Sequence, residues 1–167
     1  TPGKYTASAY FAGDETYESS SLTTSFEVLS TIKASNLSKY YKGSTKYTAT
    51  LFDSYGNALA NGNVTITVNG KSYTKKTNSK GEVSLAVNLK PGTYKIVSAD
   101  PITGYKVTTT FKILPTITSK NIKKVAGSGR KFSAKFFKGN GKALANRYVK
   151  FKVKGKIYKV KTNSNGK

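Results

Sequence analysis

Apolar and polar residues alternate along short segments of this chain. In the segment 63–69, Val64, Ile66 and Val68 alternate with threonines. Successive side chains of a strand point to opposite faces, so this segment predicts a strand with one face in a core and the other toward solvent. Similar runs rich in Thr, Val, Ile, Tyr and Phe, separated by Gly, Asn, Ser and Pro, predict seven strands in all. They lie near residues 31–35, 45–52, 63–69, 72–77, 82–88, 93–99 and 105–113.

The segments between these strands are typical of turns. Asn69 and Gly70 suit the two positive φ angles of a type I′ hairpin, and Pro91 presets a turn before Tyr94. Tyr94 has the position of the corner tyrosine found at a late strand of an immunoglobulin (Ig)-like sandwich. Seven short antiparallel strands without helical periodicity therefore predict an all-β fold, built from Ig-like β-sandwich modules. The chain has no Cys and no Trp, so it lacks the disulfide and core Trp of antibody domains.

The sequence also repeats itself with a period of 85 residues. Residues 31–82 align without a gap on residues 116–167, and Pro2, Gly3 and Tyr5 match Pro91, Gly92 and Tyr94. Self-similarity at a fixed period indicates a tandem array of modules. We therefore expect the C-terminal part of a first Ig-like module in residues 1–30, a complete module in residues 31–114 and the N-terminal part of a third module in residues 115–167.

The alternation also predicts which side chains form the cores and how the modules join. Only Ser30 separates the first and middle modules, and Leu114 and Pro115 separate the middle and last, so adjacent modules should stand nearly end to end. We expect the strands that the last module lacks to come from further residues of the same polypeptide or from a neighbouring subunit by strand exchange. The residues expected to point inward are Val64, Ile66, Val68, Leu85, Val87, Tyr94, Ile96, Phe111 and Ile113, with Val149, Phe151 and Val153 in the last module.

Three segments carry a resemblance to a known family. They are residues 11–20 (FAGDETYESS), 57–65 (NALANGNVT) and 89–94 (LKPGTY). In these motifs the chain resembles the tandem bacterial-type Ig-like repeats of prokaryotic surface adhesins, closest to the adhesin-like proteins of methanogenic archaea. The resemblance implies an extracellular protein, attached to the cell surface or cell wall, that forms a stalk or fibre. The middle module departs from it, because Pro101–Tyr105 replaces the FAGDETY motif of residues 11–17.

Charge is distributed unevenly along the chain. With 29 Lys and Arg against 7 Asp and Glu, the net charge is +22. Residues 1–30 carry one Lys and four acids, whereas residues 115–167 carry sixteen bases and no acid. Such a field attracts polyanions, for example an anionic cell-wall or host-surface polymer, without selecting among them. The candidate anion-binding face is a row of lysines in the last module: Lys150, Lys152, Lys154, Lys156, Lys159 and Lys161.

Nucleic acid is a less suitable partner for this lysine row. Single-stranded nucleic acids require aromatic side chains on the same face for stacking. Phe151 and Val153 are expected on the opposite face, in the core. A solvated sheet surface, whose like charges prevent edge-to-edge aggregation, remains the plain alternative.

Candidate residues for catalysis or metal binding are few. The chain has no His and no Cys, so we expect no enzyme activity and no cofactor. Asp14, Glu15 and Glu18 form a weak Ca²⁺ candidate or simply a solvated acidic loop. A Lys–Asn isopeptide crosslink would need a buried acid with a raised pKa, for which Glu82 and Asp53 are the candidates in the middle module. Asn36 and Asn63 begin N-glycosylation sequons.

These patterns together predict a non-enzymatic, extracellular structural or adhesive protein that forms a cell-surface stalk or fibre. Its partners would be neighbouring modules or copies of the same protein. The alternative is a basic binding module for an anionic cell-wall polymer or surface glycan. Salt-sensitive binding to wall polymers separates the two, because electrostatic binding weakens with ionic strength.

Overall fold

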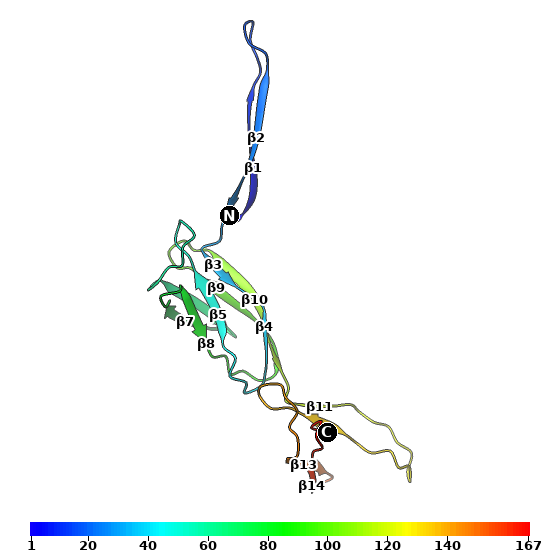
Figure 1. Cartoon of the computed structure of the whole chain (residues 1–167). Coiled ribbons are helices and arrows are strands. Elements are labelled where there is room, and N and C mark those ends of the chain that lie inside the picture. Colours follow the sequence, from blue (N-terminus) through cyan, green and yellow to red (C-terminus); the bar gives the residue numbers. More distant parts are fainter.

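The computed structural model describes residues 1–167 and contains strands but no helix. The chain therefore has no helix long and apolar enough to cross a membrane. Three parts follow one another along a line (Figure 1): a long N-terminal hairpin, a central sandwich and a smaller C-terminal region. The hairpin and the C-terminal region lie at opposite ends of the molecule.

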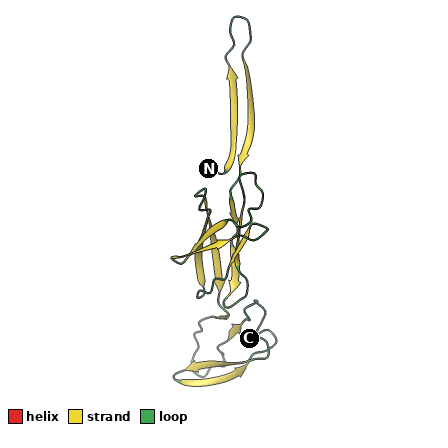
Figure 2. Cartoon of the chain, turned by 90° about the vertical axis from the view of Figure 1, so that its left-hand side faces the viewer, coloured by secondary structure: helices red, strands yellow, loops and turns green.

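The central part is a two-sheet β-sandwich (Figure 2), as expected from the alternating pattern. One sheet has three strands in the order β3-β5-β8, and the other has five in the order β4-β10-β9-β6-β7. The strands are β3 (Ile32–Ala34), β4 (Leu37–Tyr40), β5 (Tyr47–Leu51), β6 (Asn63–Val68), β7 (Lys71–Lys76), β8 (Glu82–Leu85), β9 (Gly92–Ala99) and β10 (Lys106–Leu114).

The core between the two sheets contains the predicted inward residues. Eight of the nine expected in this module are buried, and the ninth, Tyr94, is half-buried. Tyr94 donates its hydroxyl hydrogen to the Lys90 carbonyl oxygen at 2.8 Å, so the predicted corner tyrosine is confirmed. The buried core cluster is Ile32, Tyr47, Ala49, Leu51, Val64, Ile66, Val68, Val83, Leu85, Val87, Ile96, Phe111 and Ile113.

The predicted strand 31–35 is confirmed as β3, but β4 was not among the seven predicted strands. β4 belongs to the other sheet of the sandwich, where it pairs with β10 in parallel. The chain crosses between the sheets at Asn36, whose side-chain Oδ1 accepts the backbone N–H of Thr110 at 2.7 Å. This side chain takes the place of a ladder partner at the crossover. The expectation that every strand pair is antiparallel therefore fails for β4 and β10.

The two terminal parts are small open sheets. The hairpin pairs β1 (Gly3–Phe11) with β2 (Ser20–Val28). At the other end, β11 (Ile117–Ser119) pairs with β12 (Ala134–Phe136), and β13 (Tyr148–Val153) pairs with β14 (Lys156–Lys161).

The predicted core of the last module is only partly formed. Val149 and Phe151 are half-buried, whereas Val153 is 57% exposed. Its expected burial is wrong for this structure, because no strand lies along the second edge of β13 in the way that β9 lies along β6.

The middle and last modules touch each other directly at their junction. Between the middle and last modules, the rings of Tyr40 and Phe137 lie 5.2 Å apart. Tyr41 donates its backbone N–H to the carbonyl of Leu114, the residue before Pro115, at 2.8 Å. The linker is therefore held to the middle module by a backbone hydrogen bond.

Candidate functional site

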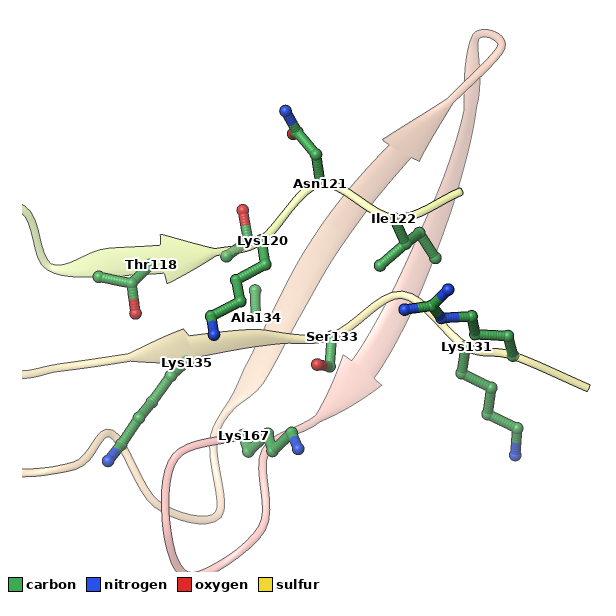
Figure 3. A pocket seen from close by; sticks show the side chains of 11 residues that line it. Thr118, Lys120, Asn121, Ile122, Lys131, Ser133, Ala134, Lys135 and Lys167 are labelled. Atoms are coloured by element: carbon green, nitrogen blue, oxygen red, sulfur yellow. The ribbon is translucent and has the colours of Figure 1, made fainter. Parts of the chain in front are cut away.

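A strongly charged concave site lies in the last module, beside β11 and β12 (Figure 3). Five cations and no acid line this cavity of about 720 Å³. Ser119 pairs with Ala134 at the end of the ladder, beyond which the two chain segments separate and open the cavity. We call it the basic pocket. It is lined by Thr118, Ser119, Lys120, Asn121, Ile122, Arg130, Lys131, Ser133, Ala134, Lys135 and Lys167.

The repeat explains how the basic pocket acquires its charge. A cavity also occurs at the equivalent place of the middle module, where Lys33 and Lys46 are the only cations in its lining. At positions 85 residues apart, Ser35, Thr45, Thr50 and Glu82 of the middle module become Lys120, Arg130, Lys135 and Lys167 of the last. The scaffold is shared, and the substitutions change a weakly basic cavity into a strongly basic one. The substitutions themselves can be read from the sequence. That the four substituted side chains line one cavity is seen only in the structure.

The predicted lysine row is divided by the strand register. Lys150 pairs with Lys159, and Lys152 pairs with Ile157, so these lysines lie on one face together with Lys161. Lys156 pairs with Val153 and lies on the opposite face, which corrects its place in the predicted set. The reason is the two-residue turn of Lys154 and Gly155, which sets the register of β14. Lys154 itself occupies this turn, with a positive φ of 45°.

One aromatic residue shares the lysine face. Tyr148 pairs with Lys161, and the Lys159 Nζ lies 4.5 Å from the centre of the Tyr148 ring. The spacing of Phe151 and Val153 along the strand gave no sign of this contact, because it depends on the pairing of Tyr148 with β14. Binding of single-stranded nucleic acid relies on several aromatic rings that stack with successive bases. This face has one ring, and Lys159 already lies over it.

The acidic loop of the hairpin has a structural role. Asp14 Oδ1 accepts the backbone N–H groups of Thr16 and Tyr17, both at 2.8 Å. Asp14, Glu15 and Glu18 do not form a group of ligands that could hold a metal ion. The carboxylate of Asp14 instead closes the turn of the hairpin, as aspartates commonly do in turns. The Ca²⁺ candidate is therefore not supported by the geometry.

Neither acid considered for an isopeptide crosslink has the required environment. Glu82 is exposed. The backbone N–H of Asn57 lowers the pKa of Asp53, with further hydrogen bonds from the same loop. A proton shuttle for crosslinking needs the opposite shift, so both candidates fail on physical grounds.

Two buried ionisable residues were not singled out by the sequence. Burial raises the pKa of Asp100, but hydrogen bonds from Thr103, the Ile102 N–H and Thr31 outweigh it and hold the pKa below its usual value. Asp100 thereby ties the start of the middle module to the turn after β9. At the opposite end, burial lowers the pKa of Lys39, which donates to the Gly43 carbonyl at 3.1 Å.

Both sequon asparagines are exposed. Asn63 begins β6, opposite Lys76. Asn36 is held at the sheet crossover by its bond from Thr110, which uses its Oδ1 and not its Nδ2 atom. Glycosylation at either position stays a prediction.

Several solved structures are similar to this chain. Domains 4–9 of the surface layer protein SbsC align at a TM-score of 0.38 and 17% identity, covering 99% of this chain and 31% of that one. A Ca²⁺-stabilised, ice-binding adhesin of an Antarctic bacterium aligns at a TM-score of 0.30 and 17% identity, covering 98% of this chain and 46% of that one. A 1.5-MDa bacterial ice-binding adhesin aligns at a TM-score of 0.25 and 19% identity, covering 67% of this chain and 41% of that one. The chain thus spans less than half the length of each of these proteins.

No curated protein sequence matches the chain significantly. The family described as the SpaA prealbumin-like fold domain matches residues 45–131, which begin before β5 and end before β12. This span is just over half of the chain and includes most of the central sandwich. The chain therefore belongs to the family of SpaA prealbumin-like fold domains.

Proposed function

We propose that this protein is a non-enzymatic, extracellular structural or adhesive repeat protein, whose modules stack end to end in a stalk or fibre at the cell surface or cell wall. The observation that carries this proposal is the direct packing of the middle module on the last module across a very short linker. A protein that only linked independent domains would separate them by a flexible segment.

The junction between the middle and last modules is fitted closely. A Cβ atom added to Gly43 would collide with the carbonyl oxygen of Gly139, so the two loops approach backbone to backbone. A Cβ added to Gly141 would lie 2.7 Å from the ring of Tyr40, which also packs against Phe137. Such contacts favour one relative orientation of the two modules. Each further module would then extend the protein in the same direction.

Three of the seven acids of the chain are used in turns. Asp14, Asp53 and Asp100 each accept backbone N–H groups of the loop that follows them. This use of carboxylates supports a structural role for the modules. The finer assignment, to adhesin-like proteins of methanogenic archaea, is supported by the motif resemblance.

Small-angle X-ray scattering of the 167-residue chain tests the stalk. A compact globule of this length has a radius of gyration of about 15 Å. We expect a clearly larger value and an elongated pair-distance distribution at infinite dilution, because the three parts are arranged in a line.

The junction can be tested in the same experiment. Gly43→Ala should loosen the orientation of the last module and broaden the distance distribution, because its Cβ has no room. Gly129→Ala, at a glycine with no atom within 4 Å of the added Cβ, serves as the control. A compact particle, or identical profiles for the two variants, would contradict the proposal.

The basic pocket favours a second function, in which the last module binds an anionic cell-wall or host-surface polymer. Five cations converge there without an acid, on a scaffold that is only weakly basic in the middle module. A flexible polyanion could contact several of them at once. In this case the stalk itself would contribute to attachment.

Binding of dextran sulfate, followed by titration at several salt concentrations, tests this second function. We expect affinity to fall steeply between about 50 and about 200 mM salt, since counterions are released on binding. Replacing Lys120, Lys131, Lys135 and Lys167 by Gln should weaken binding more than replacing Lys150, Lys152, Lys159 and Lys161, which removes the same charge from the lysine face. Equal losses would mean that only net charge matters and that the pocket is not a site.

A further inference from the structure

We propose that the central sandwich carries a binding site for an acidic polysaccharide, in which Lys39 binds the carboxylate of one uronate residue. The site belongs to the middle module and shares no residue with the basic pocket of the last module. The inference therefore goes beyond both proposed functions, and it can fail while either of them holds.

Lys39 occupies an inward-facing position of the sandwich. In β4, Leu37 packs against the core cluster, and Lys39 follows two residues later, so both side chains lie on the inner face. Only 6% of Lys39 is exposed. Burial of an ammonium group is costly unless a counter-charge or several hydrogen bonds replace the lost water.

The structure compensates this cost only in part. The Lys39 Nζ atom makes one hydrogen bond, to the carbonyl oxygen of Gly43 at 3.1 Å, although an ammonium group has three hydrogens to donate. Burial lowers the pKa of Lys39, as expected for a cation that has lost water without gaining a counter-charge. Two donor hydrogens therefore remain for a ligand with oxygen acceptors.

Lys39 lines a cavity of about 370 Å³, which we call the Lys39 cavity. A second cation, Lys42, also lines it, and no acid does. This charge favours an anionic ligand, because a binding site and its ligand usually have complementary potentials. The other lining residues are Tyr41, Val87, Asn88 and Leu89. All six residues belong to the central sandwich.

The walls of the Lys39 cavity suit a ligand larger than a bare anion. Tyr41, Val87 and Leu89 form its apolar part, and Asn88 adds an amide that can bond to hydroxyl groups. A phosphate or sulfate ion alone would leave the apolar walls against water. A sugar acid matches both parts, because its carboxylate can accept hydrogen bonds from the ammonium groups while its ring carries C–H groups and hydroxyls.

A neighbouring cavity of about 320 Å³ shares Val87, Asn88 and Leu89 with the Lys39 cavity. It adds a further cation, Lys71, and a further aromatic ring, that of Tyr73, which is 40% exposed. No acid lines this cavity either. Both cavities thus combine cations and an aromatic ring around one shared segment. This repetition favours a polymer of acidic sugars over a single small molecule.

An acidic peptide is the other extended anion to consider. Extended peptides commonly bind by adding a strand to an open sheet edge. The strand β8 ends at Leu85, and residues 86–91 form no strand, so the segment shared by the two cavities offers no regular edge. A saccharide binds through side chains and needs no such edge, which favours a saccharide here.

Titration of the 167-residue chain with a galacturonate trimer tests the site, with the NMR shifts of the Val87 and Leu89 methyl groups as the readout. The titration is done at about 150 mM salt, where a Debye length of about 8 Å limits attraction by the net charge of +22. We expect saturable shifts of these methyl groups. The methyl-esterified trimer should bind at least about tenfold more weakly, because it lacks the charged acceptor for Lys39.

Lys39→Met is the decisive variant, because methionine fills a similar volume without the charge. We expect its affinity for the trimer to fall at least about tenfold. Its free energy of unfolding should stay the same or rise, since an apolar side chain suits a buried position better than an unpaired charge. Lys90→Met is the matched control. It removes the same charge next to Leu89, but Lys90 lines neither cavity, so its affinity should change little.

Equal losses of affinity in Lys39→Met and Lys90→Met would overturn the proposal, by showing that only net charge attracts the trimer. Equal binding of the trimer and its methyl ester would do the same, as would tighter binding of a tri-aspartate peptide at the same methyl groups. If Lys39→Met fails to fold, Lys42→Met is the second test, because Lys42 is exposed in the same cavity. An unchanged affinity of Lys42→Met would then overturn the proposal. Binding of dextran sulfate at the basic pocket still tests the second function separately.

Discussion

Replacing Phe111 with Ala is expected to lower the free energy of unfolding of the middle module by about 3–5 kcal/mol. The Phe111 side chain is fully buried and lies edge-on to Tyr47, with ring centroids 6.5 Å apart. Its removal would leave a cavity in a core that has only thirteen buried residues. Small domains are stable by only about 5–15 kcal/mol, so the loss is a large share of the total. Urea denaturation followed by circular dichroism measures it.

Phe26→Ala is the matched control, since Phe26 has the same position in the repeat. Its ring stacks on Tyr5 but is half exposed, and it belongs to an open hairpin. In dilute solution we expect a change within about 0.5 kcal/mol for unfolding of the middle module, as for other substitutions away from the core. Similar losses at both positions would show that the hairpin and the sandwich unfold as one unit.

Replacing Gly81 with Ala is expected to lower the free energy of unfolding by roughly 2–5 kcal/mol, for two reasons. Gly81 has a φ of 70°, where an L-residue loses about 1–2 kcal/mol. A Cβ at this position would also lie 2.6 Å from the carbonyl oxygen of Leu51, and such overpacking costs about 1–3 kcal/mol. Leu51 is fully buried in β5, so its carbonyl group cannot move aside without disturbing the core.

Gly70→Ala separates the two contributions in the same denaturation experiment. Gly70 has a φ of 74°, close to that of Gly81, but nothing lies within 4 Å of an added Cβ. Only the backbone cost should remain, about 1–2 kcal/mol. Equal losses in the free energy of unfolding for the two variants would show that the close approach of residue 81 to Leu51 does not affect stability.

Much of the fold could be predicted because the local signals agree with one another. Val64, Ile66 and Val68 are buried as their alternation requires, and the turn of Asn69 and Gly70 joins β6 to β7. The strand β4 could not be predicted. It depends on Asn36 meeting Thr110, a residue 74 positions away, and no local pattern reports such a partner.

The candidate site was predicted less well. The sequence located the positive charge in the last module, but it grouped lysines by their spacing along the chain. The turn at Lys154 and Gly155 places Lys156 on the opposite face, and the basic pocket gathers Lys120 and Lys167 from distant segments. Surface charges have no burial pattern, so periodicity cannot indicate which of them converge.

The sequence by itself determined the module type, the repeat period, the alternation of each strand and the separation of charge between the two ends. Only the tertiary structure decided which alternating faces are covered. Phe111 and Phe26 occupy equivalent positions, as do Val68 and Val153, yet one member of each pair is buried and the other exposed. The physical reason is that an apolar face leaves water only when a second sheet or strand lies against it, and that neighbour is a property of the assembled molecule.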